Sequence, residues 1–322
     1  MSTLQDKIQK LKPNLKESSV KLYITNLKKI YREIECGGRK EQICSFDNLD
    51  FLNDYDKVMK TLEDENSNTK KNRLIAVVVT LQATEADKKL IEKYQKSMIE
   101  LAEQSNENYK KQEKSDRQKE NWVEYKDLVN LTNEILKRIK KHDILKKDVI
   151  SKAEYNLLQE YIVLRFYLNY PLRNDLAEVK VISSKDEDNK KDNFLLVTPD
   201  KITLLLNDYK TVRTFGPQEY ELDDKFSKIV RIFLKHNTSG WFITKTNRQD
   251  PISANGITKL LNRLFLRELD KKISTSMIRS ITASHDRRND ATLKEIEALK
   301  KKVSKKYLHS LDTNNMIYRK VN

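Results

Sequence analysis

The sequence has little cysteine and no long apolar run, and these absences exclude several kinds of protein. Its 2 cysteines, Cys36 and Cys44, have no second CxxC and no nearby histidine pair. A zinc site is therefore not expected, and two thiols are too few for a disulfide framework. No apolar run approaches the roughly 18 residues of a membrane-spanning helix, and the N-terminus lacks a signal-peptide core. We expect an intracellular, non-secreted protein in a reducing compartment, without a membrane partner or a bound metal.

The composition indicates a folded, basic protein. A length of 322 residues predicts two domains, and 38% hydrophobic residues supply enough apolar surface for real cores. Lysine and arginine number 63 against 48 acidic residues, which leaves a formal charge of +15. Such a surplus attracts a polyanion, so nucleic acid is the leading partner class. The alternative is a lysine-rich surface that serves solubility alone.

The first hundred residues show helical periodicity. Apolar residues recur three and four apart from Val20 to Ile34, from Phe51 to Leu62 and from Leu90 to Ala102, and residues 74–81 are nearly all apolar. This pattern predicts four helices, with the apolar one at the centre of the bundle. Residues 104–121 contain no aliphatic side chain and indicate a linker or an exposed helix end. We therefore expect a helical domain over 1–104, a linker over 105–121 and a second domain over 122–322.

The second domain mixes helices and strands. Helical spacing returns after Trp122 and from Tyr155 to Leu168, and four short β-type runs follow at 179–182, 194–197, 202–206 and 209–214. A tight turn at Asn207 and Asp208 would place Lys210 on a projecting β ribbon. From Asp223 the pattern is helical again, interrupted at 241–244. The fold class expected is α+β, mainly α with a small antiparallel β-sheet.

Five residues in chain order suggest phosphoryl transfer: Arg173, Lys210, Arg279, His309 and Tyr318. Without a metal, an enzyme must neutralise a scissile phosphate with fixed positive donors, and planar guanidinium groups match phosphate oxygens. A lysine can protonate the leaving oxygen, and a tyrosine becomes a nucleophile when a base or nearby cations assist loss of its proton. Each residue alone is a weak signal, because most arginines and lysines are solvated or in ion pairs. Apolar neighbours of Arg279, however, predict a buried guanidinium that needs an anionic partner.

In this order, and with the motifs around these residues, the chain resembles the tyrosine recombinases, the phage-integrase family. The resemblance covers nearly the whole chain. Residues 278–285 (IRSITASH) are similar to the family's second-arginine box and residues 308–313 (LHSLDT) to its Gly-His-Ser box, and Tyr318 follows His309 by the family's nine-residue step. Residues 241–244 (WFIT) and 255–261 (NGITKLL) are similar to segments that the family places between these boxes.

The resemblance implies a helical SAM-like core-binding domain followed by a tyrosine recombinase catalytic domain. Arg173 and Arg279 would hold the non-bridging phosphate oxygens with help from His309, Lys210 would protonate the leaving oxygen, and Tyr318 would attack. The product would be a 3′-phosphotyrosyl enzyme, formed without a cofactor. The implied partner is double-stranded DNA, bound by a homotetramer on two sites, with a monomer or weak oligomer in its absence. A viral or other mobile-element integrase fits this description.

The sequence departs from the family pattern near both arginines. Three residues before Arg279 the family has histidine or lysine, and here Ser276 can only hydrogen-bond a phosphate. The acidic residue expected three after Arg173 is replaced by Leu176, with Asp175 one position early. Asp175 is then either a support for the site or a helix cap. His285 matches a family position but is expected to be structural.

Two further expectations concern assembly and DNA contact. Only residues 319–322 follow Tyr318, too few for the C-terminal helix that many relatives exchange. Either the segment around Tyr318 itself or another contact is expected to hold an assembly, or the natural chain extends further. In the first domain, Lys70, Lys71 and Arg73 open the apolar helix and would contact backbone phosphates.

Two other functions remain open at this point. A type IB topoisomerase uses the same five catalytic roles, but its small viral forms carry a β-rich N-terminal domain. A catalytically inactive, DNA-binding relative is the other alternative, since a fold does not imply an activity.

Overall fold

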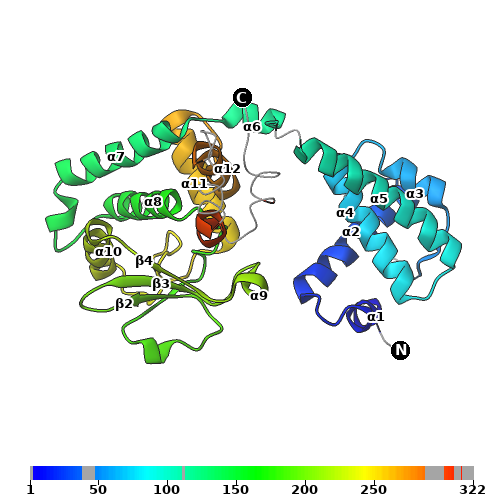
Figure 1. Ribbon diagram of the computed structural model, residues 1–322, viewed down its shortest axis with the longest axis horizontal. Helices are drawn as coiled ribbons and strands as arrows, with labels where there is room; N and C mark the ends of the chain where they lie inside the picture. The colour runs from blue at the N-terminus through cyan, green and yellow to red at the C-terminus, as the bar shows by residue number, and fades with distance from the viewer. Residues whose placement is uncertain (1–2, 38–47, 111–112, 287–300, 308–312, 314–322) are drawn as a thin grey trace. The chain divides into compact units, whose positions relative to one another are not determined.

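The computed structural model describes residues 3–37, 48–110, 113–286, 301–307 and 313. The chain divides into two compact units, Met1–Lys111 and Gln112–Asn322. The expected linker is largely helical: residues 105–110 continue the last helix of the first unit, and residues 116–121 form a short helix of the second. The chain is mainly α-helical with one small sheet, as expected for an α+β protein (Figure 1). Within the described residues, no helix is both long and apolar enough to span a bilayer.

The first unit is a bundle of helices around α4. Its described helices are α1 (Leu4–Leu11), α2 (Glu17–Glu35), η1 (Asp50–Leu52), α3 (Tyr55–Thr61), α4 (Ser67–Ala83) and α5 (Lys88–Lys110). Asn66 caps α4 by accepting a hydrogen bond from the Thr69 amide at 2.9 Å. Leu74, Val77 and Leu81 of α4 are buried in the core, so the prediction of a central apolar helix is confirmed.

Two features of the first unit were not expected. Helix α1 was not predicted from the sequence, because a single buried residue, Ile8, gives no apolar periodicity. Its start is nevertheless marked by a capping box of Thr3 and Asp6. Cys36 ends α2 and is disulfide-bonded, whereas the low cysteine content had suggested reduced thiols.

The second unit packs helices around α8 and a four-stranded sheet. Its elements are α6 (Asp116–Asn121), α7 (Tyr125–Lys141), η2 (Ile144–Lys146), α8 (Lys152–Asn169), β1 (Lys180–Ile182), η3 (Lys185–Glu187), β2 (Phe194–Val197), β3 (Ile202–Leu206), α9 (Val212–Phe215), β4 (Gln218–Glu221), α10 (Asp224–His236), α11 (Ala254–Leu269) and α12 (Thr275–Asp286). Residues 301–307 are also helical. Helix α8 begins at a capping box of Ser151 and Glu154 and contacts α7, α10, α11 and α12. It is therefore apolar on nearly all sides, as a central helix must be.

The sheet is mixed, so the expectation of a wholly antiparallel sheet was wrong. Its order is β1-β2-β3-β4, and β1 pairs with β2 in parallel while the other two pairs are antiparallel. The connection from β1 to β2 contains η3 and is long enough to reverse the chain twice, which a parallel pair requires. Residues 240–242 bond the other edge of β1, since Val181 donates to the Gly240 carbonyl and Phe242 to that of Val179.

Residues 209–214 do not form the strand that their composition suggested. The side-chain oxygen of Asn193 accepts hydrogen bonds from the amides of Asn207 and Asp208, both at 2.9 Å, and these bonds turn the chain away from the sheet. The chain then forms α9 and reverses at Gly216, whose φ of 67° is left-handed. Lys210 therefore lies in the β3–β4 connection, before α9, and not on a β ribbon.

Candidate active site

Arg279 lies in the second turn of α12 and is almost entirely enclosed, with 1% of its surface exposed. Its Nη2 atom donates a hydrogen bond to the main-chain carbonyl of Tyr307 at 3.3 Å. Tyr307 belongs to the described helical segment 301–307. The predicted burial of this arginine is confirmed, and part of its compensation comes from the main chain.

Arg173 lies in the turn that follows α8 and is half-buried. Its amide donates to Oδ2 of Asp175 at 3.0 Å. The next residue, Asn174, fixes this turn to two helices: its Nδ2 donates to Oγ1 of Thr258 at 3.2 Å, and its Oδ1 accepts from Oγ1 of Thr275 at 2.7 Å. Since Thr275 opens α12, the turn that carries Arg173 is joined directly to the helix that carries Arg279.

Asp175 connects the two arginines electrostatically. Burial raises the pKa of its carboxyl group, and the positive charges of Arg173 and Arg279 both oppose that rise. Tyr167 and Tyr220 are within the electrostatic reach of both Asp175 and Arg279, although burial is the main reason that the pKa of each phenol is raised. Asp175 lies in a turn and at the start of no described helix, so it is not the helix cap that the sequence allowed.

Lys210 is exposed in the β3–β4 connection. Its neighbour Tyr209 is buried and donates from its hydroxyl to the Gly216 carbonyl at 2.5 Å. Burial, and then the charge of Asp175, raise the pKa of Tyr209. Tyr209, the neighbour of Lys210, is thus within electrostatic range of the same carboxylate as the two arginines.

The other predicted site residues divide into described and undescribed ones. Ser276 is exposed in the first turn of α12, one helical turn before Arg279. His285 stacks on Tyr125 with ring centroids 4.2 Å apart, which agrees with its expected structural role. His309 and Tyr318 lie outside the described residues.

The basic residues at the start of α4 differ in their surroundings. Lys70 donates to the Glu63 carbonyl at 3.4 Å, and both Lys70 and Lys71 are partly exposed. Arg73 is buried, and its Nη2 lies 2.6 Å from Oε1 of Glu65. This ion pair of a buried arginine with a partly exposed glutamate favours a structural role for Arg73, whereas phosphate contact by the two lysines remains a prediction.

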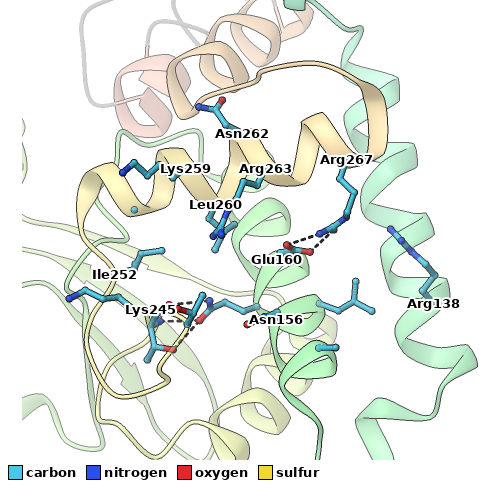
Figure 2. A pocket seen from close by; sticks show the side chains of 16 residues that line it. Arg138, Asn156, Glu160, Lys245, Ile252, Lys259, Leu260, Asn262, Arg263 and Arg267 are labelled. Atoms are coloured by element: carbon cyan, nitrogen blue, oxygen red, sulfur yellow. Dashed lines mark hydrogen bonds and ion pairs between the residues drawn. The ribbon is translucent and has the colours of Figure 1, made fainter.

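A cavity of about 900 Å³ lies elsewhere in the second unit, between α7, α8, α11 and residues 244–252 (Figure 2). None of the predicted site residues that the structure describes lines it. An ion-pair network lies at one end of this cavity. Arg267 lies 2.7 Å from Glu160 and 2.9 Å from Glu268. Glu268 in turn lies 3.0 Å from Arg138. These pairs join α7, α8 and α11, so this end of the cavity is explained by packing of the three helices. Among the described residues, no cluster of metal-ligating side chains is present.

No family model and no curated protein matches the sequence. Among solved structures, the chain is similar to the crystal structure of XerA recombinase, with 11% sequence identity and a TM-score of 0.37. The similarity extends over 99% of this chain and 94% of that chain. A similarity at this level does not assign a function, which has to come from the residues themselves.

Proposed function

We propose that this protein is a site-specific DNA recombinase or integrase that cuts and rejoins strands through Tyr318. Arg173 and Arg279 bind the non-bridging oxygens of the scissile phosphate, and His309 adds a hydrogen bond there. Lys210 supplies a proton to the leaving group. Ser276, which is exposed in the first turn of α12, hydrogen-bonds the same phosphate.

The convergence of Arg173 and Arg279 on Asp175 is the observation that carries the proposal. Both guanidinium groups act on the carboxyl group of Asp175, and Asn174 bonds the turn that carries Arg173 to Thr275 at the start of α12. Such a set binds an anion of fixed geometry, and arginine matches phosphate oxygens through two parallel N–H groups. Arg173 and Arg279 are 106 positions apart in the sequence, so a purely structural pairing of each with a local acid would not need this convergence.

The proposed chemistry conserves the phosphodiester bond energy. The phenolic oxygen of Tyr318 forms a bond to phosphorus, and the bond to the 5′ oxygen breaks. The phenol releases its proton to solvent water while nearby cations stabilise the phenolate, because Ser276 is a poor base. The ammonium group of Lys210 protonates the departing 5′ oxygen. A second DNA end reverses these steps, so no nucleotide, metal or other cofactor is consumed.

The proposed partner is double-stranded DNA, and the formal charge of +15 supports it. We propose a homotetramer that holds two sites and a monomer or weak oligomer without DNA. The protein then acts inside the cell, where its DNA is, and integration of a viral or mobile element is the role proposed for it.

The central test is a covalent-capture experiment. A bound sequence is first selected from a pool of random duplexes, and a nicked copy of it is then incubated with the full chain. We expect protein attached to a 3′ DNA end, none with Tyr318→Phe, and wild-type yield with Tyr23→Phe as a matched control in the first unit. Capture by Tyr318→Phe equal to that of the wild type contradicts the proposal.

A second substrate isolates the role of Lys210. A sulfur atom in place of the bridging 5′ oxygen leaves without a proton, so this DNA should restore cleavage by Lys210→Ala and not by Arg279→Ala. Relaxation of any supercoiled plasmid by monomeric protein would instead favour a type IB topoisomerase. DNA binding without covalent capture would indicate an inactive relative.

A further inference from the structure

The helical segment 301–307 packs against α12 and β4 immediately before the motif that contains His309 (red in Figure 1). Val303 and Tyr307 are each 1% exposed and form an apolar cluster with Ala283 of α12. The hydroxyl of Tyr220 in β4 donates to the Lys305 carbonyl at 2.8 Å. The segment is therefore attached to β4 and to α12, the helix that carries Arg279.

Tyr307 contacts α12 through its main chain and through its side chain. Its carbonyl accepts from Nη2 of Arg279 at 3.3 Å, and its hydroxyl donates to Oδ2 of Asp286 at 2.6 Å. Arg279 and Asp286 are seven positions apart on α12, a rise of about 10 Å along a helix. One tyrosine thus fixes the end of segment 301–307 at two points along α12, and we name these two contacts the Tyr307 anchor.

The Tyr307 anchor fixes the main-chain carbonyl that Arg279 uses as a hydrogen-bond acceptor. The bond from the phenol to Asp286 holds the Tyr307 residue against α12, so the carbonyl keeps a constant position relative to the Arg279 guanidinium. If the phenol lost its bond to Asp286, the carbonyl would be held by fewer contacts and the guanidinium group could reorient.

We propose that Tyr307 and Asp286 are positioning residues, which hold segment 301–307 against α12 and thereby fix the orientation of the Arg279 guanidinium group. This inference rests on the proposed function and adds two residues to it. Neither belongs to the set predicted from the sequence, and neither touches the phosphate.

Charges around the phenol are consistent with a permanent hydrogen bond. Burial, and then the carboxylate of Asp286, raise the pKa of Tyr307, while Arg279 opposes this rise. The phenol therefore stays protonated and keeps donating throughout the range in which enzymes are assayed. Lys306 also lies 3.0 Å from Oδ2 of Asp286, so the carboxylate has two partners from the same segment.

The test separates positioning from packing. Tyr307→Phe keeps the buried ring and removes only the hydroxyl, so it should lower the rate of covalent capture about 10- to 100-fold while DNA affinity stays within about twofold. Asp286→Asn keeps an acceptor for the phenol and should stay within about threefold of the wild type, whereas Asp286→Ala should match Tyr307→Phe.

Two matched controls accompany these variants. Lys306→Ala removes the ion pair and keeps the Tyr307 anchor, so its capture rate should be close to that of the wild type. Tyr155→Phe removes another buried phenol, which hydrogen-bonds Oγ1 of Thr244 at 2.9 Å in the same unit, and should leave the capture rate unchanged. A loss of rate in Tyr155→Phe equal to that in Tyr307→Phe would assign the effect to stability and overturn the positioning role.

A DNA-free measurement distinguishes failure of this inference from failure of the proposed function. Hydrogen exchange of amides 303–307 should be faster in Tyr307→Phe than in the wild type and unchanged in Tyr155→Phe. If the wild type never forms covalent DNA, the proposed function is wrong, and the exchange result still decides whether the Tyr307 anchor holds the segment. If the wild type cleaves and Tyr307→Phe cleaves equally fast, the positioning role is wrong.

Discussion

Among the residues that the structure describes, each unit buries one arginine, and the two arginines are compensated differently. Arg73 in α4 of the first unit has its own carboxylate, Glu65, at 2.6 Å. Arg279 in α12 of the second unit donates to a main-chain carbonyl and shares the field of Asp175 with Arg173. The first arrangement balances one charge with one charge and serves stability. The second brings two guanidinium groups into the electrostatic range of one buried carboxylate, as the proposed phosphate site requires.

The largest expected effect comes from replacing the guanidinium group of Arg279 by the ammonium group of a lysine. Arg279→Lys keeps the charge and loses the planar pair of donors, so the rate of covalent capture should fall about 10²- to 10³-fold. Single-turnover cleavage of nicked DNA measures this rate. Arg267→Lys, another arginine of the same unit that pairs with Glu160, is the matched control and should cleave at the wild-type rate. An Arg279→Lys protein that cleaves normally would show that Arg279 is only structural.

A smaller effect comes from removing the acid that faces each arginine. Glu65→Gln leaves the buried Arg73 without a charged partner, so the free energy of unfolding of the first unit should fall by about 1–3 kcal/mol. Urea denaturation measures this change. In the second unit, Asp175→Asn should lower the free energy of unfolding less than Glu65→Gln does, because burial already disfavours the charge of the Asp175 carboxylate. The same variant should lower the rate of covalent capture. Equal losses of stability in the two variants would remove the distinction between the units.

The smallest effect concerns buried phenols at alkaline pH. Burial raises the pKa of Tyr94 in the first unit and of Tyr167, Tyr220 and Tyr307 in the second. The unfolded chain releases these protons near pH 10, before the folded chain does, so stability should be complete below pH 10 and decrease above it. Each such tyrosine should lower the free energy of unfolding by about 1 kcal/mol by pH 11. The second unit should lose more stability than the first, because it contains more of these buried phenols. Comparing the pH dependence of unfolding in Tyr94→Phe and Tyr220→Phe with the wild type isolates single groups; an unchanged slope in both would contradict the expectation.

Much of the fold was predictable because it depends on local pattern. The stripe from Val20 to Ile34 and the apolar run at 74–81 correspond to α2 and α4, and the runs at 194–197 and 202–206 correspond to β2 and β3. Residues 209–214 were predicted as a strand because their composition is strand-like. A distant side chain, Asn193, takes the amides that a strand would need, and no local pattern contains that information.

The candidate site shows the same limit. Arg173, Lys210 and Arg279 were found by their order and by the motifs around them. The contribution of Asp175 depends on a turn that Asn174 attaches to α11 and α12. Asp286 and Tyr307 could not be found at all, since their link is one hydrogen bond between residues 21 positions apart, across a strongly charged stretch.

The sequence alone determined the class of fold, the central helices, the basic charge and the residue types that suggest phosphoryl transfer on DNA. Periodicity, composition and chain order are properties of near neighbours or of the whole chain, so they are readable without coordinates. Only the tertiary structure decided that β1 pairs in parallel, that Lys210 lies before a short helix, and that two distant arginines share Asp175. Those outcomes depend on hydrogen bonds and charges between segments far apart in the chain, which form only when the second unit closes around α8.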